Sequence, residues 1–227
     1  MQRKSIVQPR TEETAFLGEL AGAIWSNLTT LLIIDSLLLA AAMPVVLLAL
    51  AGVWLLAPLV AVVTLGPLWA ATIAVADRLN LGDDASLRTF ARMVGRHGRT
   101  GAAVSGVPGV VATALLGTGN LLAAHPGERW LLLPLFVDGS VATLALLAAF
   151  SAFSLATTGG MTGVPLWRAS LAVAAASPLT TLASIALLVL AWLGSTVFGP
   201  IVPVLLAAPL GLFLSATTWR SPALRRS

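Results

Sequence analysis

The few charged residues of this chain are separated by apolar stretches too long for a water-soluble fold. Between Glu19 and Asp77 the only charge is Asp35. No charge lies between Arg168 and Arg220. A helix needs about 20 predominantly apolar residues to cross a hydrocarbon core of about 30 Å. Counted in units of that length, the apolar stretches predict membrane-spanning helices.

Composition excludes the main alternatives. Of 227 residues 58% are hydrophobic and 10% are charged, whereas a soluble domain has about 25% charged residues. No soluble domain of this size could cover so much apolar surface. The chain has no cysteine, which excludes disulfides, thiolate metal sites and cysteine nucleophiles. Its net charge of +4 comes from short segments between apolar runs, and this placement favours anionic phospholipid headgroups as partners and not nucleic acid.

The predicted fold class is all-α, a polytopic membrane helical bundle. Residues 24–218 are expected to form one transmembrane domain, between a cytoplasmic lead-in of residues 1–23 and a basic tail of residues 219–227. The six expected spans are residues 24–48, 54–75, 101–123, 130–156, 179–193 and 201–216. Turns are expected at residues 51–53 and 194–200.

The placement of lysine and arginine predicts the orientation, because these residues concentrate on the cytoplasmic side. With six spans and a cytoplasmic N-terminus, twelve of the 13 basic residues lie inside and only Arg129 lies outside. A count of five or seven spans would break this asymmetry. We therefore expect a multi-pass protein of the plasma membrane with both ends in the cytoplasm.

Residues 84–97 are predicted to form a separate amphipathic helix on the cytoplasmic side, with Asp83 or Asp84 as its N-cap. One face carries Leu87, Phe90, Ala91 and Val94, and the opposite face carries Arg88, Arg92, Arg96 and Arg99. Such a helix is suited to lie in the headgroup layer with its arginines on phosphates. The alternative is that the same face packs on a cytosolic partner.

Asp35 and Asp138 form the candidate intramembrane polar site. An aspartate at the centre of a span costs about 2.5–3.5 kcal/mol on insertion scales, so each should face the bundle interior. The functional interpretation is a proton or cation relay or a substrate contact, and the alternative is a hydrogen-bonded packing role, slightly favoured for Asp35. Asp138 is the better functional candidate because it follows Pro134 by one turn and adjoins Gly139. Were both carboxyls to face one cavity, they would titrate as a coupled pair.

The third span is rich in small residues. Gly101, Ser105 and Gly109 recur at spacing four, and Pro108 lies among them. Close packing of helices is the favoured interpretation. A broken helix that lines a pathway is the alternative.

No enzyme signature is present. The stretch GGMTG at residues 159–163 lacks the spacing of a phosphate-binding loop. His97 and His125 fall on opposite sides of the predicted membrane, so they cannot share a metal. The sequence predicts neither catalysis, nor a metal, nor a cofactor.

Residues 62–79, VVTLGPLWAATIAVADRL, resemble the T-[IL]-G-P-x-x-x-A signature of the YesL-like family of bacterial membrane proteins. The stretch LRTFARMVGRHGR after the acidic loop resembles the basic, aromatic-bearing helix that leads into that family's next span. About 40 residues carry the resemblance. Two features depart from the family pattern, namely a longer distance from Pro58 to Thr64, and Thr72 and Ile73 in place of an aromatic residue.

The resemblance implies a six-span bundle and a role beside carbohydrate uptake and utilisation systems. The expected function is that of a non-enzymatic accessory component with transporter subunits as partners. The alternative is a small secondary transporter or channel that uses Asp35 and Asp138.

Overall fold

The computed structural model describes residues 18, 21–22, 24–81, 83, 86–198 and 201–220. This part of the chain consists of helices and turns and contains no strand. The elements are α2 (Leu28–Leu50), η1 (Trp54–Leu56), α3 (Ala57–Asn80), α4 (Leu87–Ala124), η2 (Arg129–Leu131), α5 (Leu132–Thr157), α6 (Gly163–Ala176), α7 (Pro178–Phe198) and α8 (Ile201–Arg220). The predicted all-α class is confirmed.

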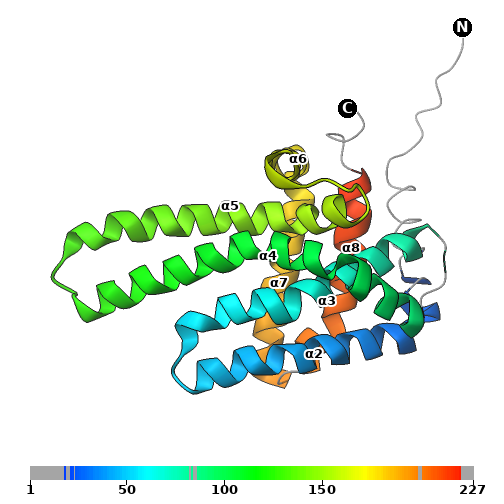
Figure 1. Cartoon of the computed structure of the whole chain (residues 1–227), viewed down its shortest axis with the longest axis horizontal. Coiled ribbons are helices and arrows are strands. Elements are labelled where there is room, and N and C mark those ends of the chain that lie inside the picture. Colours follow the sequence, from blue (N-terminus) through cyan, green and yellow to red (C-terminus); the bar gives the residue numbers. More distant parts are fainter. Residues whose placement is uncertain are drawn as a thin grey trace, which may run out of the picture.

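Four stretches among the described residues are long and apolar enough to cross a membrane. They are Leu28–Leu50, Trp54–Asn80, Leu87–Ala124 and Arg129–Thr157. The helices α2, α3, α4 and α5 of these stretches lie side by side in a layer (Figure 1). Large apolar side chains such as Leu47, Leu133 and Phe136 are more than 60% exposed on this layer. An apolar exterior around hydrogen-bonded helices is the surface that a lipid-embedded bundle presents, so the chain is a helical membrane protein.

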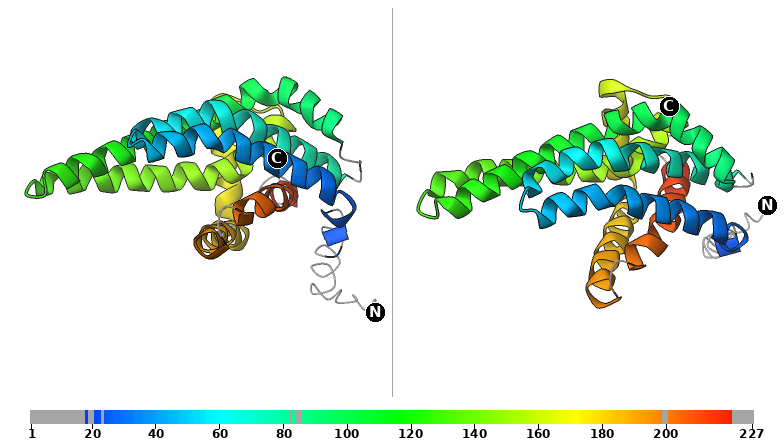
Figure 2. Two further views of the ribbon diagram at one scale, coloured as in Figure 1. Left: turned by 90° about the horizontal axis from the view of Figure 1, so that it is seen from below. Right: turned by 60° about the horizontal axis from the view of Figure 1, so that its bottom comes forward.

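The predicted fifth and sixth spans coincide with α7 and α8, but these helices do not continue the layer. They cross α2 to α5 steeply (Figure 1) and lie on one side of them (Figure 2). Helix α8 packs on α2, α3, α5 and α7. Helix α7 continues through Phe198, into the predicted turn at 194–200. Residues 199–200, most of the lead-in and residues 221–227 lie outside the described part of the chain.

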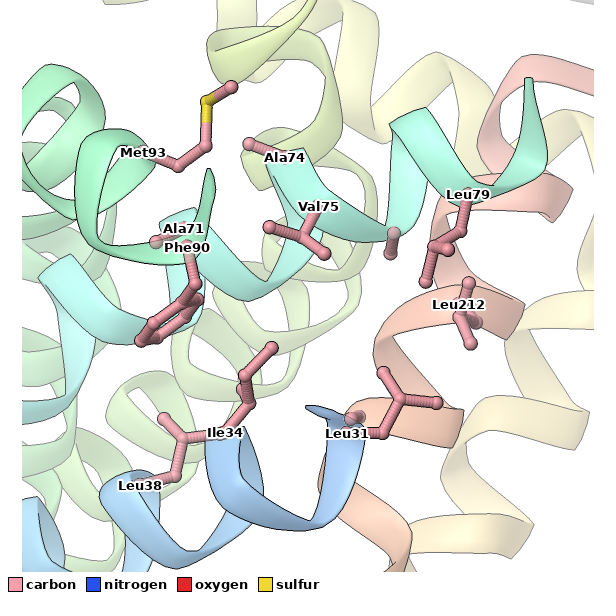
Figure 3. Close-up of a cluster of buried hydrophobic side chains, with 12 residues drawn as sticks. Leu31, Ile34, Leu38, Ala71, Ala74, Val75, Leu79, Phe90, Met93 and Leu212 are labelled. Atoms are coloured by element: carbon pink, nitrogen blue, oxygen red, sulfur yellow. The ribbon is translucent and has the colours of Figure 1, made fainter. Parts of the chain in front are cut away.

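Two clusters of buried apolar side chains hold the layer together. The first lies between α2, α3, the beginning of α4, and α8 (Figure 3). There Ile34 of α2 and Val75 of α3 lie among Phe90 of α4 and Leu212 of α8. The second joins α3 and α4 to α5, α6 and α8 around Ile73 and Leu155. Both clusters therefore include α8, which anchors the crossing pair to the layer.

Helix α4 differs from the prediction, since the expected helix of residues 84–97 and the expected span of residues 101–123 form one helix of 38 residues. Its N-cap is Ser86, whose hydroxyl accepts a hydrogen bond from the Thr89 N–H at 3.2 Å. Asp83 is not the cap, because it forms an ion pair with Arg78 at 2.9 Å. Asp84 lies outside the described residues. At about 1.5 Å per residue α4 is about 57 Å long, so its basic end extends beyond a hydrocarbon core of about 30 Å.

Two of the turns contain glycines with a positive φ. Gly52, in the predicted turn at residues 51–53, has a φ of 77° between α2 and η1. Gly160 and Gly163 each have a φ of 65° in the turn from α5 to α6. Residues with a Cβ rarely adopt these angles, which explains why both chain reversals occur at glycine.

Candidate functional site: buried carboxylates and a basic helix

A buried polar cluster surrounds Asp77, near the C-terminal end of α3. Its carboxylate is 5% exposed and accepts hydrogen bonds from Ser154 of α5, at 3.1 and 3.3 Å to its two oxygens. It also accepts hydrogen bonds from the hydroxyls of Thr158, just after α5, and of Ser215 in α8. Hydroxyls from α5, from the residue that follows α5 and from α8 thus converge on one carboxylate of α3.

Asn80 extends this cluster by one turn of α3. Its side-chain amide donates to the Ser215 hydroxyl at 2.9 Å and to the Leu212 carbonyl at 3.4 Å. The amide donates to a hydroxyl that in turn donates to Asp77, so the dipoles point the same way. Such an aligned network strengthens each of its hydrogen bonds and fixes the position of α8 against α3.

Asp35 makes a second attachment of α8. Its side chain is 1% exposed, and one carboxylate oxygen accepts a hydrogen bond from the backbone N–H of Ala208 at 2.7 Å. Pro209 follows inside α8, and a proline ring displaces the carbonyl one turn earlier, which loosens the helical hydrogen bonds there. The carboxylate therefore accepts a hydrogen bond from the backbone N–H of the residue that precedes the proline of α8.

Asp138 lies in a different place. It is half-buried and accepts a hydrogen bond from the Thr118 hydroxyl of α4 at 2.6 Å. Asp35 is hydrogen-bonded to α8 and Asp138 to α4, so the structure gives the two predicted site residues separate partners. Asp77 is the carboxylate that, like Asp35, accepts a hydrogen bond from α8.

The small residues of α4 meet small residues of α3. A Cβ added at Gly101 would lie 2.3 Å from the Gly66 carbonyl oxygen, and one at Gly109 would lie 2.3 Å from the Val62 side chain. The Ser105 hydroxyl donates to the Val62 carbonyl across the two helices at 3.3 Å. Helix α4 continues through Pro108. Close packing is therefore the correct interpretation of the small-residue pattern, and a broken helix is not.

The glycine of the YesL-like signature takes part in this crossing. A Cβ at Gly66 would approach the Ser105 hydroxyl and the Gly101 carbonyl. The signature thus marks the point where α3 and α4 come closest, which gives it a packing role in this chain.

The basic part of α4 has an exposed side that carries its arginines and a buried side, but the buried side is not the predicted one. Arg88, Arg92, Arg96 and Arg99 are all exposed. Phe90 and Met93 are buried, at 3% and 8% exposure, in the cluster shown in Figure 3. The apolar face therefore packs on α2 and α3 of its own chain and is not the lipid-facing or partner-facing surface that we expected. Leu87 and Ala91 also differ from the expectation, because both are exposed.

Among the described residues, these arginines have no acidic partner. The described residues contain one ion pair, between Arg78 and Asp83, and it leaves the four arginines of α4 without an acidic partner there. We call Arg88, Arg92, Arg96 and Arg99 the arginine ridge. It is a positively charged surface carried by a helix that is anchored on its other side.

An apolar cavity of about 430 Å³ lies beside the crossing of α3 and α4. Val62, Trp69, Phe153 and Ala207 contribute to its walls, and Ser105 is its one hydroxyl. No aspartate lines it. The cavity suits hydrocarbon and offers little to an ion or a polar solute.

No group of three or more histidine or acidic side chains that could hold a metal occurs among the described residues. The carboxylates at Asp35, Asp77 and Asp138 take protein hydrogen-bond donors. What this arrangement does chemically is to join helices through buried hydrogen bonds.

Asp77 was not among the predicted site residues because it lies beyond residue 75, where the second span was expected to end. A signal for its burial was present, since Ala70, Ile73, Ala74 and Asp77 share one face of a helix by their spacing. The first three of these residues are buried as well. A carboxylate on an otherwise apolar face indicates a buried polar contact.

Comparisons with protein-family models, curated proteins and solved structures give no match. The geometry of the site is therefore the basis for what it can do.

Proposed function

We propose that the protein is a six-span component of the bacterial plasma membrane that acts as a non-enzymatic accessory subunit of a transport system. Its cytoplasmic face, with both termini and the arginine ridge, is the docking side. The YesL-like resemblance of residues 62–79 narrows the proposal to carbohydrate uptake and utilisation.

The exposed arginine ridge is the observation that carries this proposal. Its helix is held in place by Phe90 and Met93, so the charges project from a fixed surface. Fixed charges without an acidic partner in the described chain provide electrostatic complementarity for a partner, which favours rapid and specific association.

Six spans agree with the lengths of the last two helices. Helices α7 and α8 have 21 and 20 residues, which corresponds to about 30 Å each and matches a hydrocarbon core. Six crossings also leave Arg129 as the one basic residue outside, as the distribution of positive charge in membrane proteins favours.

Affinity purification of the full-length chain in mild detergent tests the accessory role. We expect co-purification of permease or ATPase subunits of a carbohydrate transport system. The triple variant Arg88→Gln, Arg92→Gln, Arg96→Gln should lose them, and the matched variant Arg129→Gln should keep them. Recovery of the wild-type chain alone as a stable homomer would overturn the proposal, as would equal recovery of subunits with the triple variant.

The alternative, a small secondary transporter or channel, gains less support. Asp35 and Asp138 have separate partners, and the cavity beside the crossing of α3 and α4 is apolar. Solute or proton flux into liposomes, compared between wild type, Asp35→Asn and Asp138→Asn, tests it. Flux that either substitution abolishes would replace the accessory role with transport.

A further inference from the structure

A second cavity of about 430 Å³ lies between α4 and the turn that leads into α6. Helix α6 packs on α5 and is seen nearly end-on in Figure 1. The cavity lies beside α4 where its basic residues end and the expected third span begins, and Arg99 is among the residues that line it.

The α4 wall of this cavity changes from polar to apolar along the helix. Arg99 and Thr100 line its first part, and Val104 lines it one turn further toward the middle of the span. Residues at these spacings share one helix face. A ligand that lies along this wall therefore has a charge and a hydroxyl beside one end and an apolar side chain beside the other.

The wall formed by the turn and α6 also combines polar and apolar side chains. Thr162 of the turn lines the cavity, followed one turn later in α6 by Leu166 and Trp167. Tryptophan is enriched at the level of the lipid headgroups, where its ring meets apolar chains and its N–H meets water. Both walls thus combine polar groups with an apolar surface.

No acidic side chain of the described residues forms an ion pair with the charge at the polar end. Arg99 is exposed, and the one ion pair of the described residues lies elsewhere, between Arg78 and Asp83. Guanidinium groups bind phosphate through parallel N–H donors. Basic pockets between helices on the cytoplasmic side bind anionic lipid headgroups.

We propose that this cavity binds one anionic glycerophospholipid. Its phosphate lies on the Arg99 guanidinium and the hydroxyls of Thr100 and Thr162, and the upper part of its acyl chains lies along Val104 and Trp167. The proposal rests on the membrane placement of α4 but not on the accessory role, so either can fail without the other.

Native mass spectrometry of the purified full-length protein tests the site, with phosphatidylglycerol and phosphatidylcholine added in separate titrations. Arg99→Gln should weaken phosphatidylglycerol binding about fivefold, the effect of about 1 kcal/mol for one arginine near a membrane surface. Arg88→Gln, an exposed arginine of the same helix that does not line the cavity, should change it less than twofold. Val104→Trp should reduce binding by filling the apolar part, with far-ultraviolet circular dichroism as the check that each variant folds.

Equal phosphatidylglycerol affinity in wild type, Arg99→Gln and Val104→Trp would overturn the proposal. Equal affinity for phosphatidylcholine and phosphatidylglycerol in wild type would also overturn it. A third arm adds inorganic phosphate as the competitor. Displacement of the lipid by millimolar phosphate would identify a site for the free anion, whereas retention of the lipid supports the proposed site.

Discussion

At Asp77 a single carboxylate accepts hydrogen bonds from Ser154, Thr158 and Ser215. Its removal would leave three hydroxyls without that acceptor, two of them in fully buried residues. A buried polar group that loses its partner costs about 1–3 kcal/mol. We therefore expect Asp77→Ala to lower the free energy of unfolding by about 2 kcal/mol or more, measured by chemical unfolding in detergent and followed by circular dichroism.

Asp83→Ala is the matched control for this substitution. Asp83 is exposed and pairs with Arg78 at the surface, where an ion pair contributes about 0–1 kcal/mol. Equal loss of stability in the two variants would show that the buried cluster does not anchor α8.

Asp35 and Asp138 should differ in their effect on stability, in agreement with the packing role that the sequence slightly favoured for Asp35. Asp35→Ala leaves the buried Ala208 N–H unpaired and should cost about 1–3 kcal/mol, whereas Asp35→Asn retains an acceptor and should cost less. Asp138→Ala affects one half-buried hydroxyl and should cost less than about 1 kcal/mol. Unfolding free energies of the three variants check this order, and a larger loss at Asp138 would contradict it.

The sequence could identify Asp35 and Asp138, because each is a lone charge within an apolar stretch. It could not identify their partners. The Ala208 N–H is distant in sequence from Asp35, and no pattern distinguishes the Thr118 hydroxyl from those of other threonines. Asp77 was not predicted as a buried residue because it adjoins Arg78, and two neighbouring charges are typical of the polar end of a span. Burial of its carboxylate depends on α5 and α8, which no local pattern places there.

Among the elements, the crossing of α3 and α4 depends on Gly101. A Cβ there would meet the Gly66 carbonyl at 2.3 Å, so Gly101→Ala must separate the helices and should cost about 1–3 kcal/mol. Gly95, on the same helix, has nothing within 4 Å of the corresponding position. Gly95→Ala should be neutral or stabilise α4 by up to about 1 kcal/mol. Thermal unfolding of both variants tests the crossing, and a Gly101→Ala variant as stable as Gly95→Ala would refute it.

Phe90 and Leu87 separate the two interpretations of the basic helix. Phe90 is buried in the same chain, whereas Leu87 is 43% exposed. Phe90→Ala should destabilise the purified protein by about 3 kcal/mol or more, and Leu87→Ala should have a small effect. If Phe90 instead faced lipid or a partner, both substitutions would leave the unfolding free energy of the isolated chain nearly unchanged.

Much of the element structure could be predicted from the sequence. The first four spans and the turn at Gly52 lie close to their expected places because length and apolar composition determine them. The union of the basic helix, expected at residues 84–97, with the third span, expected at residues 101–123, was not predicted, and the glycines between and within them did not settle it. Whether a glycine breaks a helix or allows a close contact depends on the helix opposite, here α3.

At the scale of the whole molecule, local sequence patterns determine that α7 and α8 are helices, whereas packing determines how they are oriented. Their apolar lengths predicted two helices, and two helices are present. Both helices cross α2 to α5 steeply (Figure 2), and Asp35, Asp77 and Asn80 hold α8 in this position through hydrogen bonds. The orientation of the cytoplasmic face depends on whether these two helices cross the membrane.

Labelling of single cysteines in intact cells tests the six-span topology most directly, because the natural chain has no cysteine. With a membrane-impermeant maleimide we expect Thr196→Cys, near the end of α7, to react from outside, as should Gly127→Cys in the turn before α5. Asp83→Cys should react only after the membrane is permeabilised. A Thr196→Cys variant that behaves like Asp83→Cys would contradict six spans and leave four.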